Sequence, residues 1–320
     1  MTGLKKLRID YAGRDFLSLL DYTADDLAYF LDVADYLKAE HKAGRETPYL
    51  KGKTMGLIFE KSSTRTRVSF ESGIYYLGGM GLFLSSHDLQ IGRGEPIKDT
   101  ARVLSRFLNG LMIRTFSHDI VTELAEYADI PVINGLTDLL HPCQVLADLQ
   151  TIREHKGQLA GLKMAFIGDG NNMAHSLMNG GARMGINVCC ACPEGYWPDA
   201  RVVADAQAAA ALSGGSVTVV QDPLEAAKDA DVIYTDVWAS MGQEAEKAAR
   251  ETVFGGVYQV NDKLMAAARP DAMVLHCLPA HRGEEITDGV FESHPEIFDE
   301  AENRLYAQMA VMALLLADKK

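Results

Sequence analysis

The alternation of short apolar runs with longer helical patterns is the feature that most constrains the fold of this chain. Each apolar run is bounded by Gly, Pro, Asp or Ser, and the segments between runs repeat apolar residues at helical spacing. This alternation is typical of parallel strands joined by crossover helices. The predicted strands are 54–59, 81–85, 111–115 and 131–133, then 163–167, 187–192, 217–220, 231–235 and 273–277.

The two series of strands predict an α/β protein with two doubly wound parallel-sheet domains joined by interdomain helices. A chain of 320 residues, 48% of them hydrophobic, is long enough to bury two cores. We expect domains over 1–145 and 146–299, with the helix that begins at Pro142 bridging them. Other helices are expected at 23–42, capped by Thr23, and at about 300–318.

The acidic composition excludes several classes of partner. A net charge of -13 and a pI near 5.1 argue against nucleic acid and anionic membranes, which are bound mainly through Lys and Arg. No stretch reaches the roughly 18 to 20 apolar residues of a membrane span, and the N-terminus lacks an apolar targeting segment. We therefore expect a cytoplasmic globular protein.

The cysteines do not form the pattern of a disulfide framework. There are five, and three of them lie in CCAC as Cys189, Cys190 and Cys192. We interpret these as small buried residues of a parallel strand. The alternative, a metal site, lacks the His and Cys spacing of a zinc tetrahedron.

The stretch FEKSSTRTRVSFE, residues 59–71, places basic and hydroxyl side chains at the start of a predicted helix. Ser63 or Thr64 can cap this helix, and Arg65 and Arg67 follow in its first turn. The helix macrodipole already places positive partial charge there, so cations are unfavourable without a bound anion. The pattern predicts a phosphate site built from free N–H groups, hydroxyls and arginines.

Two other interpretations of this stretch compete with a phosphate site. Arg65 and Arg67 could pair with Glu60 and Glu71 and have no ligand. A nucleotide P-loop is excluded, because no G-x-x-x-x-G-K occurs in the chain.

Further residues of the first half point to the same chemistry. His141 and Gln144 in HPCQ lie three residues apart, across the first turn of their helix, and can face one point beyond its N-terminus. Arg114 ends the apolar run LMIRTF, at the strand end where ligands gather in open α/β sheets. Together with STRTR, these residues predict a site for a phosphate and a polarised carbonyl.

The second half contains a partial dinucleotide fingerprint, GDGNN at 168–172, after a predicted strand. Its third glycine is replaced by Met173, although Glu194 lies at a plausible distance for a ribose contact. The alternative is that Asn171 and Asn172 present amides to a polar substrate.

Two later strands are also followed by polar or irregular segments. Asp236, in YTDVWASMGQE, offers a carboxylate for an ammonium group, and the Ser240–Gly242 turn offers backbone contacts. Cys277 and Leu278, in HCLP, stand at the mouth of the last predicted strand, before an irregular loop.

These four motifs, STRTR, HPCQ, DVWASMG and HCLP in this order, resemble the ornithine carbamoyltransferases over nearly the whole chain. STRT and HPxQ are shared with the aspartate relatives, so they imply carbamoyl phosphate. SMG and HCLP imply ornithine. The resemblance implies carbamoyl transfer to the δ-amine of L-ornithine, giving citrulline and phosphate, with no metal and no redox cofactor.

The resemblance also implies site residues. Those for carbamoyl phosphate are Ser63, Thr64, Arg65, Thr66, Gln90, Arg114, His141, Gln144, Cys277, Leu278 and Arg304. Those for ornithine are Asn172, Asp236, Ser240 and Met241. Arg114 and His141 are the implied catalytic residues, and Cys277 is a third candidate that modulates proton loss rather than acting as a nucleophile. Arg304, in the ENR expected to open the last helix, implies that a helix over 300–320 packs back on the first domain.

A loop from a neighbouring subunit completes the site in the family. Residues 85–100 match that loop, with Gln90 and Lys98 as candidates to reach across. The resemblance thus implies a homotrimer or a multiple of trimers. The alternative is that 85–100 is an ordinary surface loop.

Three other functions compete with ornithine carbamoyl transfer. A nicotinamide dehydrogenase would use GDG but leaves STRTR and HPCQ without a task. A non-catalytic phosphate-binding subunit would have lost site groups, whereas every matched position is filled here. A putrescine carbamoyltransferase is not expected to keep SMG. The AHRGEE after HCLP looks more like the biosynthetic branch, which indicates arginine biosynthesis and leaves the catabolic direction open.

Overall fold

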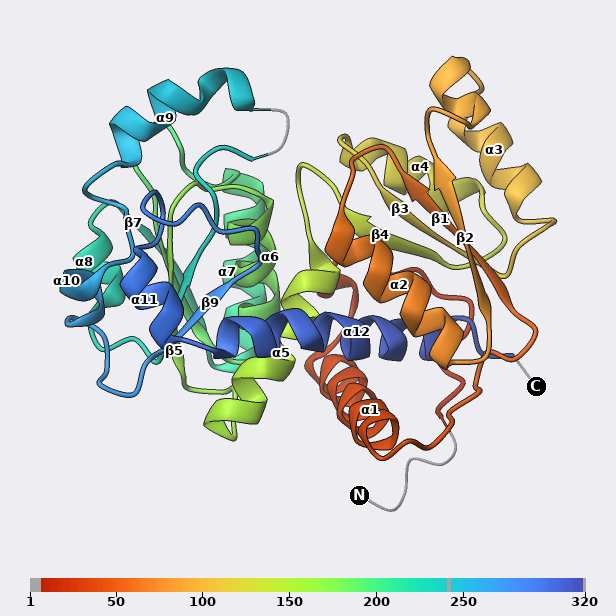
Figure 1. Cartoon of the computed structure of the whole chain (residues 1–320), viewed down its shortest axis with the longest axis horizontal. Coiled ribbons are helices and arrows are strands. Elements are labelled where there is room, and N and C mark those ends of the chain that lie inside the picture. Colours follow the sequence, from red (N-terminus) through yellow and green to blue (C-terminus); the bar gives the residue numbers. More distant parts are fainter. Residues whose placement is uncertain (1–6, 241–242, 319–320) are drawn as a thin grey trace. The chain divides into compact units, whose positions relative to one another are not determined.

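The computed structural model describes residues 7–240 and 243–318, which form two compact units. The first unit comprises Met1–Gln150 and Asn303–Lys320, and the second comprises Thr151–Glu302. The division between them falls inside helices α5 (Pro142–Lys156) and α12 (Glu296–Leu315), which Figure 1 shows as continuous ribbons.

The first unit contains a four-stranded parallel sheet in the order β2-β1-β3-β4. Its strands are β1 (Thr54–Phe59), β2 (Met80–Ser85), β3 (Gly110–Arg114) and β4 (Val132–Leu136). All four predicted strands are present, with small shifts at their ends. Helices complete the unit: α1 (Ala24–Lys42), α2 (Thr64–Tyr76), α3 (Ile97–Leu104) and α4 (His118–Tyr127), with short 3-10 turns η1 (Leu19–Asp21) and η2 (Gln90–Arg93).

Helices cover both faces of the first sheet. On one face, Ile58 and Ile113 pack with Val121 and Leu124 of α4. On the other face, α2 lies against α12, because Gly73 has no side chain to hold them apart: a Cβ there would lie 2.9 Å from the Cε of Met312. Burial of β1, β3 and β4 on both faces explains their nearly continuous apolar sequences, whereas the edge strand β2 is partly exposed.

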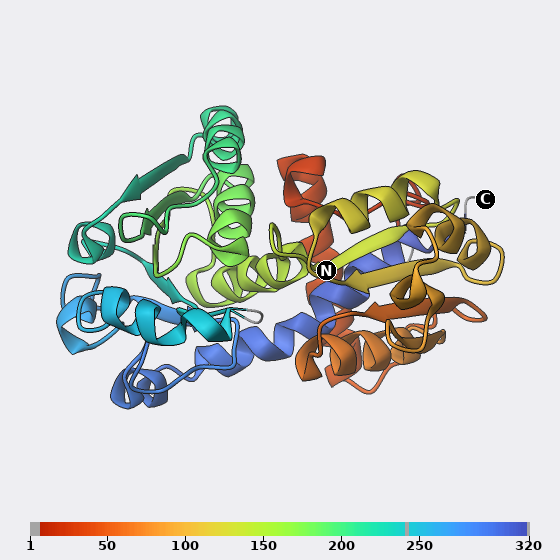
Figure 2. The same cartoon turned by 90° about the horizontal axis from the view of Figure 1, so that it is seen from above.

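The second unit contains a five-stranded parallel sheet in the order β7-β6-β5-β8-β9. Its strands are β5 (Lys163–Ile167), β6 (Asn187–Ala191), β7 (Ser216–Val220), β8 (Val232–Thr235) and β9 (Met273–His276). Its remaining helices are α6 (Asn172–Arg183), α7 (Ala200–Ser213), α8 (Pro223–Ala227), α9 (Lys247–Phe254), α10 (Asp262–Met265) and α11 (Asp288–Ser293), with η3 at Glu244–Glu246. Figure 2 shows helices on both sides of this sheet. The predicted fold class is confirmed for both units.

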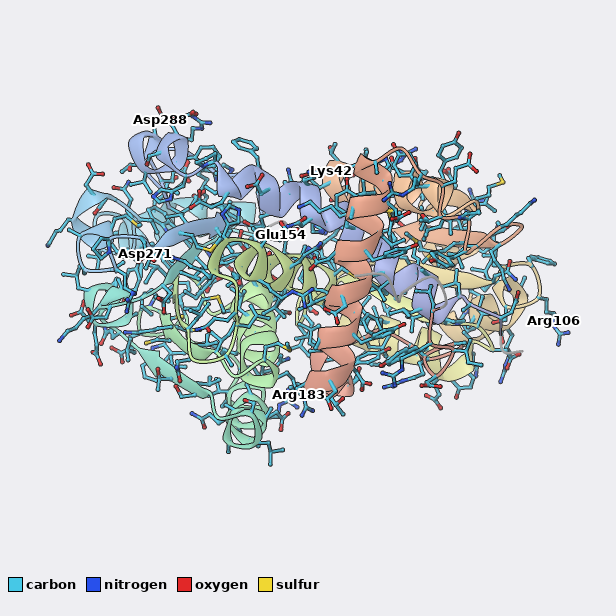
Figure 3. The ribbon with its side chains drawn as sticks, turned by 90° about the horizontal axis from the view of Figure 1, so that it is seen from below. Lys42, Arg106, Glu154, Arg183, Asp271 and Asp288 are labelled. Atoms are coloured by element: carbon cyan, nitrogen blue, oxygen red, sulfur yellow. The ribbon has the colours of Figure 1, made fainter. Side chains whose placement is uncertain are left out.

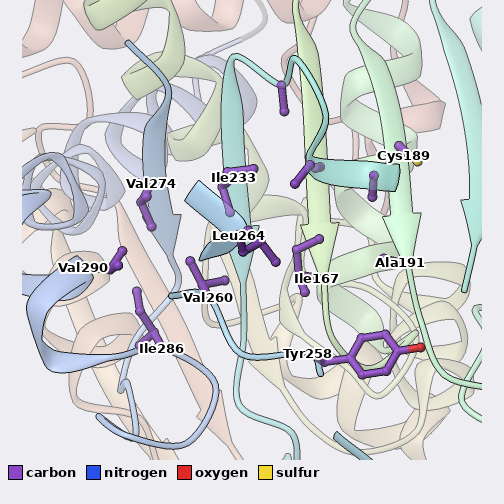
Figure 4. Close-up of a cluster of buried hydrophobic side chains, with 14 of the residues drawn as sticks. Ile167, Cys189, Ala191, Ile233, Tyr258, Val260, Leu264, Val274, Ile286 and Val290 are labelled. Carbon is purple, nitrogen blue, oxygen red and sulfur yellow. The ribbon is translucent and has the colours of Figure 1, made fainter. Parts of the chain in front are cut away.

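The core of the second unit follows the two-residue period of its strands. Ile167, Ile233 and Val274 point to one face, where they meet Leu264 of α10 and Val290 of α11 (Figure 4). On the opposite face α6 packs closely on β6, since a Cβ on Gly181 would lie 2.4 Å from the Cγ2 of Val188.

The cysteines of CCAC are buried along β6 or just after it, as expected for strand residues. Burial raises the pKa of the Cys190 thiol well above its usual value, and burial likewise raises the pKa of Cys192. Both thiols are therefore protonated and unreactive at neutral pH.

Many charged side chains lie on the surface. Arg106 in the first unit and Asp271 and Asp288 in the second are exposed, and Figure 3 shows Arg106 and Asp288 at the outline of the molecule. No helix among residues 7–240 and 243–318 is long and apolar enough to cross a bilayer.

Strand order identifies one special position in each sheet. The direction of winding reverses between β1 and β3 in the first unit and between β5 and β8 in the second. In open α/β sheets, ligands bind beyond the carboxyl ends of the strands at such a switch point. STRTR, GDGNN and Asp236 lie in the segments that follow β1, β5 and β8, and Arg114 is the last residue of β3.

Candidate active site

The N-terminus of α2 lies at the switch point of the first unit. Ser63 is its N-cap, with its hydroxyl accepting from the backbone N–H of Thr66 at 3.2 Å. Thr64 is exposed and Arg65 half-buried, whereas Thr66 is fully buried. The helix therefore begins as the sequence predicts, with no acidic residue in its first turn.

Buried arginines converge on the Thr66 hydroxyl. Its Oγ1 accepts from Arg114 Nη1 at 3.4 Å and from Arg304 Nη2 at 3.1 Å. Arg304 Nη1 also donates to Gln144 Oε1 at 2.7 Å. Four predicted residues from β3, α2, α5 and α12 thus meet, all at most 7% exposed. Arg304 lies well inside α12, so the expectation that ENR opens the last helix is wrong.

The ion-pair alternative for the two helix-start arginines holds for only one of them. Arg67 pairs with Glu71, with Nε 3.0 Å from Oε1. Glu60 instead accepts from the Thr115 hydroxyl and from the N–H of Phe116. Within residues 7–240 and 243–318, Arg65 forms no ion pair. The ion-pair alternative therefore accounts for Arg67 and not for Arg65.

His141 is neutral in this environment. Burial, followed by the positive charges of Arg304, Arg114 and Arg65, lowers the pKa of His141 well below its usual value. An imidazolium would add a fourth cation to a site with little water to screen it. Its neighbour Cys143 is inert, since burial raises the pKa of that thiol to about 12.

Three buried residues of this site were missed in the sequence. Gln308, with its amide oxygen turned to Arg304, accepts from Nη2 at 2.8 Å and Nε at 3.0 Å, and its nitrogen donates to Ser69 Oγ. Asp148 Oδ1 accepts from Gln144 Nε2 at 2.8 Å. Helical spacing is the sequence signal for two of them. Gln308 lies four residues after Arg304 and Asp148 lies four residues after Gln144, in each case on the same helix face.

The second predicted cluster lies at the end of β8. Asp236, 7% exposed, accepts from Asn171 Nδ2 at 2.9 Å and from Cys277 Sγ at 3.1 Å. Asn171 Nδ2 is also 3.5 Å from Ser240 Oγ. The structure therefore gathers Asp236, Ser240 and Cys277, and Asn172 begins the adjoining helix α6. Met241 was predicted here and lies outside the described residues.

The GDG turn does not offer a pyrophosphate site. Asn171 caps α6 with its own side chain, accepting from the N–H groups of Met173 and Ala174. Gly170 donates to the carbonyl of Tyr196 at 2.8 Å, and a Cβ on Gly170 would lie 2.2 Å from the nitrogen of Pro198. The amides that would bind phosphate are occupied, and the chain itself fills the space a dinucleotide needs. This geometry argues against the dehydrogenase alternative.

HCLP has a strained backbone. Leu278 has a φ of +58°, in the left-handed region that costs a residue with a Cβ about 1–2 kcal/mol. Cys277 and Leu278 are both partly exposed beyond β9. Backbone strain of this kind concentrates at functional sites.

Among the described residues of the second unit, two groups of side chains of the kinds that bind metals lie close together. Ligand atoms of Asp236, His276 and Cys277 lie within 4.8 Å of one another, as do those of His281, Glu284 and Glu285. In the first group, Asp236 already accepts from Asn171 and Cys277, and His276 Nδ1 accepts from the Leu278 N–H. These ligand atoms are engaged in internal hydrogen bonds, and the expectation of a metal-free reaction stays a prediction.

The predicted inter-subunit residues are exposed. Gln90 begins η2, and Lys98 lies in the first turn of α3. Their exposure leaves both available to a neighbouring chain.

Fold and geometry together define an α/β protein with buried arginines at the switch point of one unit and a buried carboxylate at that of the other. The model of the aspartate/ornithine carbamoyltransferase carbamoyl-P binding domain matches residues 14–154, and that of the Asp/Orn binding domain matches residues 160–315. The chain belongs to the aspartate/ornithine carbamoyltransferase family.

Individual relatives agree with this membership. The ornithine carbamoyltransferase of Symbiobacterium thermophilum is 60% identical over 99% of this chain and 100% of its own. That of Oceanobacillus iheyensis is 59% identical over 96% of this chain and 95% of its own. The solved structure of the Pyrococcus furiosus ornithine carbamoyltransferase superposes with a TM-score of 0.93 at 54% identity, covering 97% of this chain and 99% of that one.

Proposed function

We propose that this chain transfers the carbamoyl group of carbamoyl phosphate to the δ-amine of L-ornithine, giving L-citrulline and phosphate. The observation that carries the proposal is the convergence of Arg114 and Arg304 on Thr66 at the N-terminus of α2. Such a cluster is unfavourable alone and becomes favourable with a bound phosphate. The relatives named ornithine carbamoyltransferase support ornithine as acceptor.

The donor phosphate binds at the start of α2 in this proposal. Ser63, Thr64 and Thr66 supply hydroxyl and backbone donors, and Arg65 and Arg304 supply charge. Residues 1–145 with the helix at 300–320 would form the carbamoyl-phosphate domain. The half-buried Arg65 without an ionic partner supports this assignment, because its charge is available to a dianion.

The carbonyl oxygen of the donor faces Arg114 and His141. Both are buried, so their hydrogen bonds to a developing oxyanion gain strength from low solvent exposure. His141 acts as a neutral donor, since its lowered pKa keeps the imidazole uncharged. Gln144 and the carbonyl oxygens of Cys277 and Leu278 accept from the donor amino group.

The acceptor binds in the second domain, residues 146–299. Asp236 pairs with the α-ammonium of ornithine, and Asn172 and the backbone at Ser240 and Met241 receive the carboxylate. The hydrogen bonds that hold Asp236 in place, from Asn171 and Cys277, support a preorganised acceptor site.

The reaction then needs little beyond orientation and charge. The neutral δ-amine attacks the carbonyl carbon, a tetrahedral oxyanion forms beside Arg114 and His141, and phosphate departs at the end of α2. No covalent intermediate is needed, so Cys277 is not a nucleophile. Its thiol donates to Asp236, which makes it a modulator of the acceptor side.

A homotrimer, or a multiple of trimers, in the cytoplasm completes the proposal, with Gln90 of a neighbouring chain contributing to carbamoyl-phosphate binding. Tyr75 of α2 is 73% exposed and Met80 of β2 is 57% exposed, so the first unit has apolar surface that such an assembly would bury. The proposed direction is toward citrulline, which the relative from Pyrococcus furiosus named "Ornithine carbamoyltransferase, anabolic" supports.

The pH dependence of activity should not arise from His141. An unperturbed primary amine has a pKa near 10, so raising the pH increases the fraction of neutral δ-amine, and kcat/KM for ornithine should rise from about pH 6 upward. His141 stays neutral throughout this range because its pKa is shifted downward. We expect His141→Asn to lower the rate at every pH and to leave the apparent pKa of the profile unchanged. A shifted profile in the variant would contradict a neutral His141.

The proposed function is tested by citrulline formation from carbamoyl phosphate with a panel of acceptors, without added metal or nicotinamide. Ornithine should give the highest kcat/KM, ahead of putrescine, aspartate and N-acetylornithine. Putrescine lacks the α-carboxylate and aspartate lacks the δ-amine, so the panel separates recognition of the two ends. A preference for another acceptor would overturn the assignment.

A further inference from the structure

A buried histidine and glutamate lie beside Cys277 and Leu278 and have no task in the chemistry above. His276, the last residue of β9, is 1% exposed, and Glu285 is fully buried. His276 Nε2 is 3.1 Å from Glu285 Oε1, which also accepts from the N–H of His281 at 2.5 Å. A carboxylate placed inside a protein at the edge of an imidazole orients that ring.

The other ring nitrogen faces the backbone. The Leu278 N–H donates to His276 Nδ1 at 2.9 Å. A backbone amide can only donate, so Nδ1 carries no proton, and the proton of the neutral ring must lie on Nε2, pointing at Glu285. The hydrogen bonds therefore define one tautomer of His276. Glu285 accepts from its Nε2–H, and its bare Nδ1 accepts from the Leu278 N–H.

This hydrogen bond controls a peptide group at the site. The peptide bond between Cys277 and Leu278 is trans and planar, so its N–H and its C=O point in opposite directions. Fixing the Leu278 N–H on the ring therefore fixes the direction of the Cys277 carbonyl oxygen. Leu278 has a left-handed φ of +58°, which is unfavourable for a residue with a Cβ, and the hydrogen bond to His276 helps to hold this conformation.

We propose that His276, oriented by Glu285, is a positioning residue that aims the Cys277 carbonyl oxygen at the donor amino group. The proposal rests on the proposed function, which assigns that carbonyl to the amino group of carbamoyl phosphate. His276 does not touch the substrate in this proposal and acts only through the Cys277–Leu278 peptide.

Two crossed variants separate positioning from simple burial. His276→Asn keeps an oxygen acceptor near the Nδ1 position and loses the donor to Glu285. His276→Gln keeps a donor near the Nε2 position and loses the acceptor for Leu278. The matched control is His294→Asn, since His294 Nδ1 lies 2.7 Å from Glu296 Oε1 in another partly buried pair of the same unit.

We expect His276→Gln to lower kcat by about 100-fold, the scale of a misplacement near 1 Å, with the folded fraction unchanged. His276→Asn should retain most of the activity even if it is the less stable protein, and His294→Asn should match the parent. Measuring kcat, KM for carbamoyl phosphate and urea unfolding on all three gives the comparison. Parental kcat in His276→Gln, or kcat losses that follow stability in both variants, would overturn the proposal.

Nitrogen-15 NMR of the imidazole rings supplies a readout that does not depend on turnover. The His276 signals, assigned by their loss in His276→Asn, should show a bare Nδ1 and a protonated Nε2. Glu285→Gln should weaken that preference and lower kcat. A proton on Nδ1 in the parent protein contradicts the proposal. Failure of the parent to form citrulline would instead overturn the proposed function. The NMR measurement of the His276 tautomer does not depend on that outcome.

Discussion

Replacing Arg65 by alanine should lower kcat/KM for carbamoyl phosphate by roughly 30- to 1000-fold, while the protein stays folded. The expected loss is about 2 to 4 kcal/mol, the scale of a charge-assisted contact that strengthens in the transition state. Because Arg65 has no ion pair among the described residues, its removal breaks no internal contact of that kind. Loss of a cation from a helix N-terminus should leave the free energy of unfolding unchanged or slightly higher without ligand.

Arg67 provides the matched control for this variant. It lies two residues later in the same helical turn, but its guanidinium pairs with Glu71 and lies 3.7 Å from the centre of the Phe83 ring. Arg67→Ala should therefore affect carbamoyl-phosphate affinity much less. Steady-state kinetics, calorimetric titration with carbamoyl phosphate and urea unfolding are measured for both. If Arg65→Ala unfolds and keeps its ligand affinity, Arg65 is a structural residue.

Replacing Asp236 by asparagine should weaken ornithine binding by about 1.5 to 3 kcal/mol, the range of hydrogen bonds to charged groups. The variant keeps the shape of the side chain and one oxygen that can accept from Asn171 Nδ2, while the negative charge for the α-ammonium is lost. Carbamoyl-phosphate binding should barely change, since its phosphate contacts are assigned to α2 and Arg304.

Calorimetric titration measures the loss of acceptor binding separately from any loss of carbamoyl-phosphate binding. L-norvaline carries the head group of ornithine without the δ-amine, so it can be titrated in the presence of carbamoyl phosphate without turnover. Norvaline and ornithine should both bind the variant more weakly than they bind the parent protein. Putrescine, which lacks the head-group carboxylate, is titrated for comparison with these two amino acids. Equal losses for carbamoyl phosphate and norvaline, or no loss for norvaline, would move the α-amino site elsewhere.

Local patterns were sufficient to predict the elements on which the site is built. The predicted strands all exist, and Thr23 and Ser63 are the N-caps of α1 and α2. These features depend on residues within a few positions of one another, such as the Ser63 hydroxyl and the Thr66 amide. Arg114 was placed at a strand end for the same reason.

The roles of the GDG turn and of the arginines at the start of α2 depend on residues that are distant in the sequence. The glycines of GDG are compatible with a pyrophosphate turn in sequence, but Gly170 is pressed against residues 196–198 and Asn171 caps its own helix. The choice between an ion pair and a free guanidinium at Arg65 and Arg67 likewise depended on where Glu60 points.

The sequence by itself determined the α/β class, the strands and caps, and which side chains stand at strand ends, because these follow from short-range spacing. Only the tertiary structure decided strand order, and with it the switch points that bring β1 beside β3 and β5 beside β8. It also brought Arg304 to Thr66, 238 residues away in the chain, and set the His276 ring against Leu278 with Glu285 behind it. Such contacts depend on long-range packing and on the desolvation of buried charges, and no local pattern encodes either.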